Sequence, residues 1–297
     1  MKRAILCLLA AALLLTAAMA EDTKDADVFD LLIVGTDAGG EGERGRSDTM
    51  VLVRLDASAG EIRMVSFLRD LYVTIPGHGR DRLNAAWFHG GAALLLQTLE
   101  ENFGVTADAY AEVDFHRLVR VIDAIGGVEA DVSEAERVQL NGTLRHYNRS
   151  IGAEETEQLL SAAGRVMFTG RQALCYSRIR KLDGDLQRTS RQREVLESAF
   201  RRVMKLDVLS MAALAVNHLD AVTTDLTAGD IIRLIPLALR VKDAAFAAIT
   251  VPADGAWEDL TVGGMQVLAV DAAEEQARVR AFLEGETQPP AEDVDPA

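Results

Sequence analysis

Apolar and polar positions follow one another from residue 27 onward in a pattern that predicts an α/β chain. The apolar stretch VFDLLIVGTD, closed by Gly and Asp, is typical of a buried strand. DTMVLVRLD alternates, ASAG predicts a turn, and EIRMVSFL predicts a returning strand. YAEVDF and VEADV predict two more strands, and HRLVRVIDAIGG between them predicts a helix that ends on glycines.

The same pattern predicts the elements and the domain limits in the rest of the chain. Asn84 is placed to cap the helical stretch AAWFHGGAALLLQTLEENFG, which Gly90 and Gly91 can break in two. Residues 133–164 are polar and weakly patterned, so a long excursion, a candidate lid or rim, is expected there. Residues 206–285 alternate helix-like and strand-like stretches. Because no repeat or linker interrupts residues 27–285, we expect one domain over that range.

The two ends of the chain differ from this pattern. Lys2 and Arg3 precede an apolar segment that closes on Ala-Met-Ala, so residues 1–20 are predicted to be a signal peptide, or alternatively an N-terminal anchor. The protein is then expected to act outside the cytoplasm, either secreted or anchored at the outer face of the bacterial cytoplasmic membrane. The Pro-rich acidic end, residues 286–297, is predicted to be disordered.

Charge is distributed unevenly along the 297 residues. The formal net charge is −15, which argues against general nucleic-acid binding, because that affinity comes from neutralising phosphates. Residues 165–205 nevertheless carry eleven basic and four acidic side chains, a local charge of +7. A basic patch in an acidic protein indicates a specific anionic ligand. Once the signal peptide is removed, only Cys175 remains, so a disulfide framework and a cysteine-based metal site are excluded and a buried thiol is expected.

The basic segment YSRIRKLDGDLQRTSRQR spans residues 176–193. If YSRIRK is a strand, Arg178 and Arg180 share one face and can bind neighbouring oxygens of a diphosphate. Asp185 is then placed to cap the following helix. The alternative is that these arginines are solvated at the surface or pair with Asp183 and Asp185.

The predicted helix after this turn carries Arg188 and Gln192 on the face that packs inward, with Arg191 beside them. We therefore expect these three polar groups at the rim of the core, where the helix N-terminus also attracts anions.

A second group of charged residues is expected at one end of the sheet. Asp37 follows the first strand and Asp48 begins the second, while Arg46 and Arg69 lie at the same edge. Two carboxylates without a histidine pair suit Mg²⁺, or Mn²⁺. Alternatively, GTDAGGEGERGRSDT is an ordinary turn with solvated charges.

Four stretches in order, GRSDTMVLVRLDASAGEIRMVSFLRDLYVTIPG, RLNAAWFHGG, DAIGGVEADV and GRQALCYSRIRKLDGDLQRTSRQREVL, resemble the LytR-CpsA-Psr family of bacterial cell-wall enzymes. The resemblance implies a three-layer α/β/α sandwich with a mixed central sheet. It implies a phosphotransferase that moves a glycopolymer, such as teichoic acid or capsule polysaccharide, from a polyprenyl-pyrophosphate carrier at the membrane surface onto a peptidoglycan hydroxyl.

By motif position, the resemblance implies an Mg²⁺ site at Asp37 and Asp48 and pyrophosphate binding by Arg69, Arg178 and Arg180. Its D-x-x-R-x-x-R-Q segment corresponds to Asp185, Arg188, Arg191 and Gln192. Asp48, Arg69 and Asp185 are the catalytic candidates, with Asp48 and Asp185 as possible general bases. The chain departs from the family in having Leu68 before Arg69 and Leu71 after Asp70, which puts the placement of Arg69 in question.

Two other functions fit the same residues. Water in place of the sugar hydroxyl would make the protein a polyprenyl-pyrophosphate hydrolase. A non-catalytic module that binds anionic lipid or polymer would need the arginines but not Asp37 and Asp48.

Overall fold

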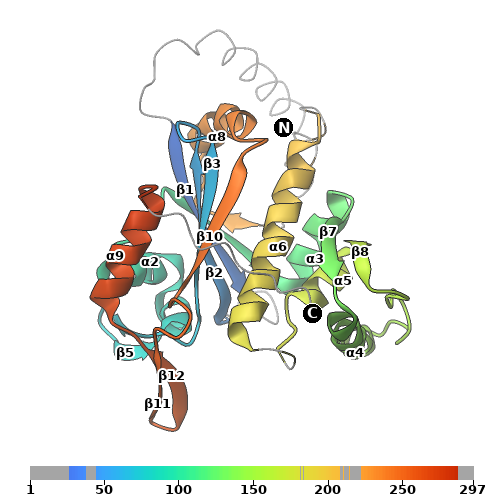
Figure 1. Ribbon diagram of the computed structural model, residues 1–297, viewed down its shortest axis with the longest axis horizontal. Coiled ribbons are helices and arrows are strands. Elements are labelled where there is room, and N and C mark those ends of the chain that lie inside the picture. The colour runs from blue at the N-terminus through green and yellow to red at the C-terminus, as the bar shows by residue number, and fades with distance from the viewer. Residues whose placement is uncertain are drawn as a thin grey trace.

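A mixed six-stranded sheet forms the centre of the protein in the computed structural model, which describes residues 27–37, 45–180, 182, 184–207, 210, 214 and 222–286 (Figure 1). The strand order is β10-β3-β2-β1-β6-β9. The antiparallel centre is β1 (Val28–Thr36), β2 (Ser47–Asp56) and β3 (Glu61–Phe67). β6 (Ala109–Asp114) pairs parallel to β1, β10 (Ala245–Val251) pairs parallel to β3, and β9 (Thr223–Thr224) closes one edge.

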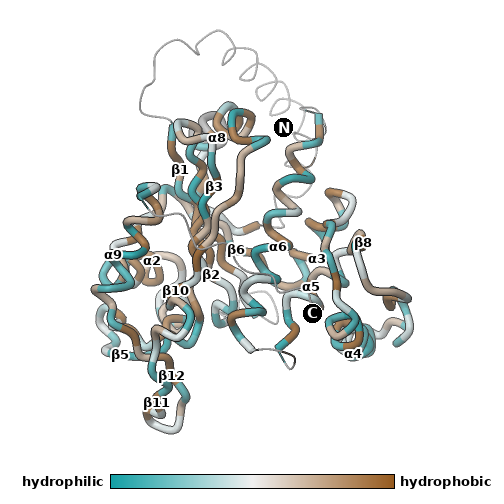
Figure 2. The backbone as a smooth tube through the Cα atoms, in the orientation of Figure 1, coloured by the Kyte–Doolittle hydropathy of each residue, from teal (hydrophilic) through white to brown (hydrophobic). Residues whose placement is uncertain are grey.

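Helices cover both faces of this sheet, so the predicted three-layer α/β/α architecture is confirmed (Figure 1). On one face lie α2 (Leu83–Phe103) and α9 (Ala272–Leu283), and on the other lie α6 (Asp185–Met204) and α8 (Ala228–Arg240). Strand β1 shows why. Leu32 and Val34 are buried against α2 and α9, whereas Phe29 packs with Leu237 of α8. A strand that is apolar on both sides belongs between two helical layers, and Figure 2 shows hydrophobic residues concentrated along these strands.

A third apolar cluster extends the layer that contains α6. It joins α3 (Phe115–Ala124), α5 (Gly170–Tyr176), α4 (Glu134–Ser150) and the hairpin of β7 (Val128–Val132) and β8 (Gly164–Phe168). The predicted excursion over residues 133–164 is therefore wrong for its first half, which is helix α4. Ser133 and Glu136 form a capping box at its start, and Leu140 and Leu144, one turn apart, are fully buried.

Helix α2 is broken where its glycines predicted a break. Gly91 has φ 64° and ψ −149°, outside the helical region. The expected cap is wrong, however, because Arg82 precedes the first helical residue and Asn84 lies buried inside the helix.

Two small hairpins lie beyond one end of the sheet: β4 (Tyr72–Ile75) with β5 (Gly79–Arg82), and β11 (Glu258–Val262) with β12 (Met265–Ala269). A bridge between Leu71 and Leu268 joins them. Within the described residues, no helix has the length and hydrophobicity of a membrane span. The predicted signal peptide and nearly all of the predicted acidic tail fall outside these residues.

Candidate active site

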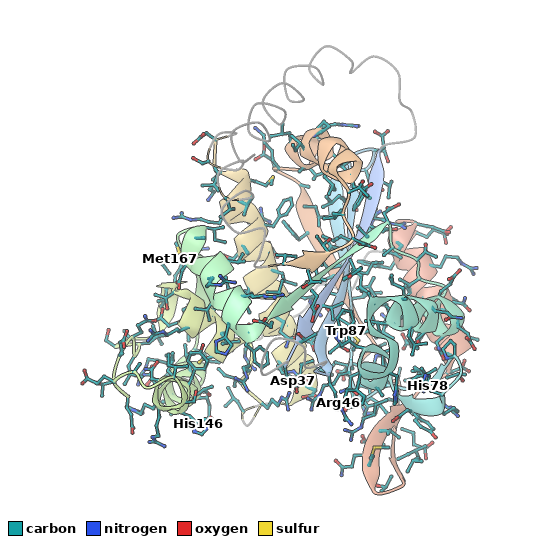
Figure 3. All side chains as sticks on the ribbon, turned by 180° about the vertical axis from the view of Figure 1, so that it is seen from behind. Asp37, Arg46, His78, Trp87, His146 and Met167 are labelled. Carbon is teal, nitrogen blue, oxygen red and sulfur yellow. The ribbon has the colours of Figure 1, made fainter. Side chains whose placement is uncertain are left out.

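The site begins at the end of β1 and β2, where the pairing is irregular. Thr36 pairs with Ser47 and Gly35 pairs with Thr49, so Asp48 is the extra residue of a β-bulge. A Cβ on Gly35 would lie 3.0 Å from the Cβ of Thr49, so a larger residue would force Thr49 to shift. The N–H of Arg46 donates to Asp37 Oδ1 at 2.7 Å, so Asp37 ends the same strand pair (Figure 3). The predicted convergence of Asp37, Arg46 and Asp48 at one sheet edge matches this geometry.

Asp48 holds two arginines together. Arg69 NH1 donates to Asp48 Oδ1 at 2.7 Å, and Arg180 NH2 lies 3.6 Å from Asp48 Oδ2. Burial lowers the pKa of Arg69, but the hydrogen bond and charge of Asp48, together with the charges of Asp70 and Asp185, outweigh it and raise the pKa overall. The backbone of Arg69 is also fixed, because its carbonyl accepts from the N–H of Asn84 at 3.1 Å. The flanking leucines, Leu68 and Leu71, are buried in the core and anchor this turn.

Arg188 is the most unusual residue of the site. Its side chain is only 2% exposed, and NH1 lies 2.9 Å from Asp185 Oδ1. That contact is an ion pair only, and neither Nε nor NH1 makes a hydrogen bond within the protein. Burial is the main reason that the pKa of Arg188 falls to about 10; the charges of Arg180 and Arg69 also lower it, whereas those of Asp185 and Asp48 oppose the fall. A buried cation with unused donors beside two other cations is completed by a bound anion.

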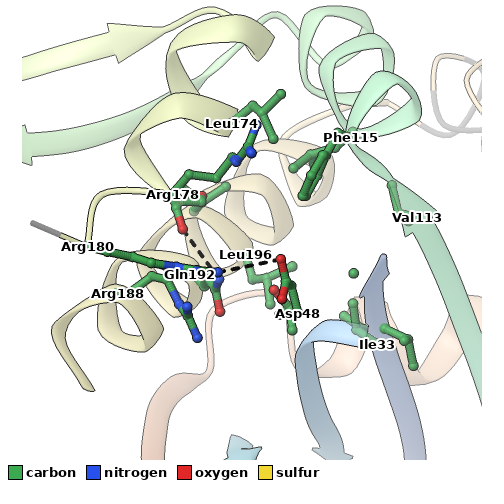
Figure 4. A pocket seen from close by; sticks show the side chains of 16 residues that line it. Ile33, Asp48, Val113, Phe115, Leu174, Arg178, Arg180, Arg188, Gln192 and Leu196 are labelled. Carbon is green, nitrogen blue, oxygen red and sulfur yellow. Dashed lines mark hydrogen bonds and ion pairs between the residues drawn. The ribbon is translucent and has the colours of Figure 1, made fainter. Parts of the chain in front are cut away.

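Asp48, Arg180 and Arg188 lie at the charged mouth of a cavity between the strand ends and helices α3, α5 and α6, and Arg69 and Asp185 contact this group from outside the cavity (Figure 4). The cavity, including its open part, measures about 730 Å³. Most of its interior walls are apolar: Ile33, Val34, Val113, Phe115, Leu118, Leu174, Val195 and Leu196. Its polar groups are Asp48, Thr49, Ser177, Arg178, Arg180, Arg188 and Gln192. An apolar interior with a cationic mouth fits an amphiphile with an anionic head.

The segment that carries Arg178 and Arg180 differs from its prediction. Residues 170–176 form helix α5, started by a capping box of Thr169 and Gln172, so the predicted strand and the strand-face argument for these two arginines are wrong. Both line the cavity all the same, because the chain turns sharply after Tyr176. The guanidinium of Arg178 lies 4.5 Å above the Phe115 ring. Cys175, in helix α5, is buried as expected, and burial raises its thiol pKa to about 12.

Three predicted site residues lie differently from expectation. Asp185 does not cap α6, because Gly184 is the N-cap and Asp185 instead pairs with Arg188 and, at 3.8 Å, with Arg69. Arg191 does not line the cavity. Its Nε lies 2.8 Å from Glu136 Oε1 and its NH1 donates to the carbonyl of Ile179, so it joins α6 to α4. Arg46 is exposed and contacts Asp37 through its backbone.

Two contacts of the site were not singled out from the sequence. Phe115, at the junction of β6 and α3, supports Arg178, and the strand-end rule that located Asp37 would also have located it. Arg82 NH1 lies 3.2 Å from Asp70 Oδ1 and so extends the charged network beyond Arg69. No sequence signal marks Arg82, since its position depends on the pairing of β4 with β5.

Residues 14–280 match the profile of the LytR_cpsA_psr family, nearly the whole chain. The chain belongs to the LytR-CpsA-Psr family. It is 31% identical over 274 residues to TagU of Oceanobacillus iheyensis, named a polyisoprenyl-teichoic acid–peptidoglycan teichoic acid transferase, which covers 89% of this chain and 78% of that protein. It is 33% identical over 176 residues to TagT of Bacillus subtilis, a match that covers 58% of this chain and 52% of TagT.

Solved structures of the LytR-CpsA-Psr family share the fold. TagT bound to LIIa-WTA superposes with a TM-score of 0.70 at 27% identity and covers 90% of this chain and 94% of that one. TagT with bound octaprenyl pyrophosphate lipid superposes with a TM-score of 0.67 at 25% identity, covering 90% and 92%.

The carboxylate oxygens of Asp37 and Asp48 in this LytR-CpsA-Psr protein are of the kind that binds a divalent cation. Mg²⁺ takes oxygen ligands and is commonly held by one or two carboxylates plus phosphate oxygens and water. Asp37 and Asp48 supply two such carboxylates at one strand end. Over the described part of the chain, no group of three or more His, Cys, Asp or Glu side chains could hold a metal. A metal here would therefore depend on substrate oxygens to complete its shell.

Proposed function

We propose that this protein transfers a glycopolymer phosphate from a polyprenyl-pyrophosphate carrier to a hydroxyl of peptidoglycan, outside the cytoplasm and at the membrane surface. The observation that carries the proposal is Arg188, a buried guanidinium with unused donors at the cationic mouth of an apolar cavity. The relatives support it, because TagU and TagT are named teichoic acid transferases and a TagT structure holds octaprenyl pyrophosphate.

The cavity accounts for donor binding in two parts. Its mouth is lined by Arg178, Arg180 and Arg188. Arg69 is held next to them by its hydrogen bond to Asp48, so four guanidinium groups can surround a diphosphate. The polyprenyl chain would lie along the apolar walls formed by α3, α5 and β1. Catalysis would then consist mainly of positioning and of stabilising the negative charge on the transferred phosphoryl group.

A divalent cation fits this scheme at Asp37 and Asp48. Mg²⁺, or Mn²⁺, would neutralise part of the diphosphate charge and polarise the phosphoryl group. Independently of the metal, Asp48 keeps Arg69 and Arg180 close together, because it contacts both. Asp48→Asn is therefore expected to disturb arginine placement as well as metal binding.

Asp185 is the better of the two candidate proton acceptors. Both oxygens of Asp48 already contact guanidinium groups. Asp185 Oδ1 pairs with Arg188, whereas its Oδ2 lies 3.8 Å from Arg69 Nε, and the side chain is 30% exposed. An acceptor hydroxyl can reach such a carboxylate, which would take its proton as the oxygen attacks phosphorus.

The test uses the purified full chain, a polyprenyl pyrophosphate that carries a labelled saccharide, uncrosslinked peptidoglycan strands and Mg²⁺. Transferase activity places label on the strands, a hydrolase releases the labelled saccharide phosphate, and a binding module retains the lipid without turnover. Either of the last two results would overturn the proposal. Chelation by EDTA and restoration with Mg²⁺ or Mn²⁺ test the metal separately. Arg201→Met, which changes an exposed arginine on the same helix, is the matched control for Arg188→Met.

A further inference from the structure

A second hollow lies on the other side of the arginine cluster. It is lined by residues of the strand β3 end, the start of α6 and the β11–β12 hairpin: Leu68, Arg69, Asp70, Arg82, Gly184, Asp185, Leu186, Gln187, Trp257, Asp259, Gln266, Val267 and Leu268. We call it the hairpin groove. It measures about 980 Å³ including its open part.

Two ion pairs separate the hairpin groove from the donor cavity. In the pair Arg69–Asp48, Arg69 lines the groove and Asp48 lines the cavity, with 2.7 Å between them. In the pair Asp185–Arg188, Asp185 lines the groove and Arg188 lines the cavity, with 2.9 Å between them. A diphosphate held by the cavity arginines is therefore next to both compartments.

The hairpin that forms the far wall is firmly attached. Arg82 Nε donates to the carbonyl of Gln266 at 2.9 Å, and Arg82 NH1 lies 3.2 Å from Asp70 Oδ1. The N–H of Leu268 donates to the carbonyl of Asp70 at 2.9 Å. The groove is thus a preformed site, which lowers the entropic cost of ordering it around a ligand.

The groove's chemistry differs from that of the cavity. Trp257 is half-buried and offers an aromatic wall, while Asp259 and Gln266 are exposed and offer hydrogen-bonding groups. Asp70 and Asp185 add two more carboxylates. A sugar ring matches this combination, because its C–H face packs on an indole ring and its hydroxyls donate to carboxylates. An anionic lipid matches it less well, because three carboxylates line the groove against only two guanidinium groups.

Direction of attack decides which sugar the groove holds. In phosphoryl transfer the attacking and leaving oxygens lie roughly in line through phosphorus. If the leaving polyprenyl phosphate occupies the cavity, the attacking hydroxyl comes from the opposite side. Resting on the proposed function, we propose that the hairpin groove binds a sugar ring of the acceptor glycan, with Trp257 as its stacking platform and Asp259 as a hydrogen-bond partner.

The test measures acceptor and donor separately. Initial rates are recorded with varied uncrosslinked glycan strands at saturating donor, and then with varied donor at saturating strands. For Trp257→Ala we expect the KM for strands to rise about tenfold, with the KM for donor unchanged within a factor of two. Trp257→Phe should recover part of the loss. Asp259→Asn, at an exposed position that does not endanger folding, should raise the strand KM about threefold. Phe88→Ala, at an exposed aromatic outside the groove, is the matched control.

Calorimetry with the same strands measures the groove without turnover. If wild-type protein binds strands, Trp257→Ala weakens that binding and no coupled product forms, the proposed function fails while glycan binding in the groove stands. If Trp257→Ala and Asp259→Asn bind and use strands as wild type does, the groove assignment is overturned. A rise in the donor KM alone would also overturn it, because the groove would then hold sugars of the donor polymer.

Discussion

Arg188 and Arg191 lie three residues apart on α6 and are both almost fully buried, yet their surroundings differ. Arg191 is 4% exposed, contacts Glu136 at 2.8 Å and donates to the carbonyl of Ile179, so its charge is matched within the protein. Arg188 is 2% exposed and pairs with Asp185, but its Nε and NH1 have no acceptor. The charge of Arg191 is therefore matched within the protein, whereas Arg188 keeps donors that an anionic ligand would satisfy.

Burial alone therefore does not identify a binding arginine. The partner does, because a buried charge is costly unless it is paired and hydrogen-bonded. Around Arg191, burial raises the pKa of Glu136, but hydrogen bonds from Arg191 and Ser133 outweigh this and lower it overall. Around Arg188, burial dominates and lowers the pKa of the arginine itself. The protein thus keeps an unfavourable charge where a substrate would bind.

Arg191→Met should have the largest effect, and on stability. It leaves the Glu136 carboxylate, 16% exposed, without its guanidinium partner. Breaking a buried pair from one side costs about 3–5 kcal/mol. Guanidinium unfolding at pH 7 should show this loss, and Arg191→Met/Glu136→Gln should recover part of it. A loss below about 1 kcal/mol would mean that the ion pair with Glu136 does not stabilise the fold as proposed.

Arg188→Met should act on turnover instead. Removing donors that are proposed to bind the diphosphate is expected to lower kcat/KM for the donor about 100-fold, or about 2.7 kcal/mol of transition-state stabilisation. The free energy of unfolding should stay the same or rise, because an incompletely bonded buried cation disappears. Arg201→Met should change neither quantity. Wild-type kcat/KM in the Arg188 variant would contradict the proposed donor site.

The sheet and its strand ends could be predicted from the sequence because they depend on local periodicity. The strand pattern brought Asp37, Asp48 and Arg69 to one edge, as the structure does. The predictions fail where a helix starts with polar residues, because such a start resembles a loop or a strand end. Ser133 with Glu136 and Thr169 with Gln172 both carry the capping-box spacing, which identifies helices α4 and α5 from sequence.

The roles of the two arginines could not be predicted in the same way. Arg188 and Arg191 occupy one helix and the same motif, and only tertiary packing brings Glu136, 55 residues away, to Arg191. The hairpin groove depends on contacts of still greater separation, such as Arg82 with Gln266 across 184 residues. No local pattern carries that information.

Glu136→Gln should make the stability of the Arg191 region less dependent on pH. The folded-state pKa of Glu136 lies below its ordinary value of 4.5, so the stability from its charge is present above about pH 4.5 and is lost as pH falls through the lowered pKa. At pH 7 the variant should be about 2 kcal/mol less stable than wild type, the scale of hydrogen bonds to a charged group. The difference should shrink below pH 4.5 in unfolding curves recorded from pH 7 to pH 3. A difference independent of pH would show that the charge is not what matters.

Ser133→Ala should have the smallest effect and tests what holds Glu136 in place. The Ser133 Oγ and backbone N–H both donate to Glu136 Oε2, while Oε1 accepts from Arg191. Losing the hydroxyl removes half of the capping box and should cost about 1 kcal/mol of unfolding free energy. Because this contact supports Arg191 and not Arg188, kcat/KM for the donor should stay within a factor of two of wild type. A larger fall in turnover would show that the surroundings of Arg191 and Arg188 are coupled, and that the two regions cannot be separated into one for stability and one for binding.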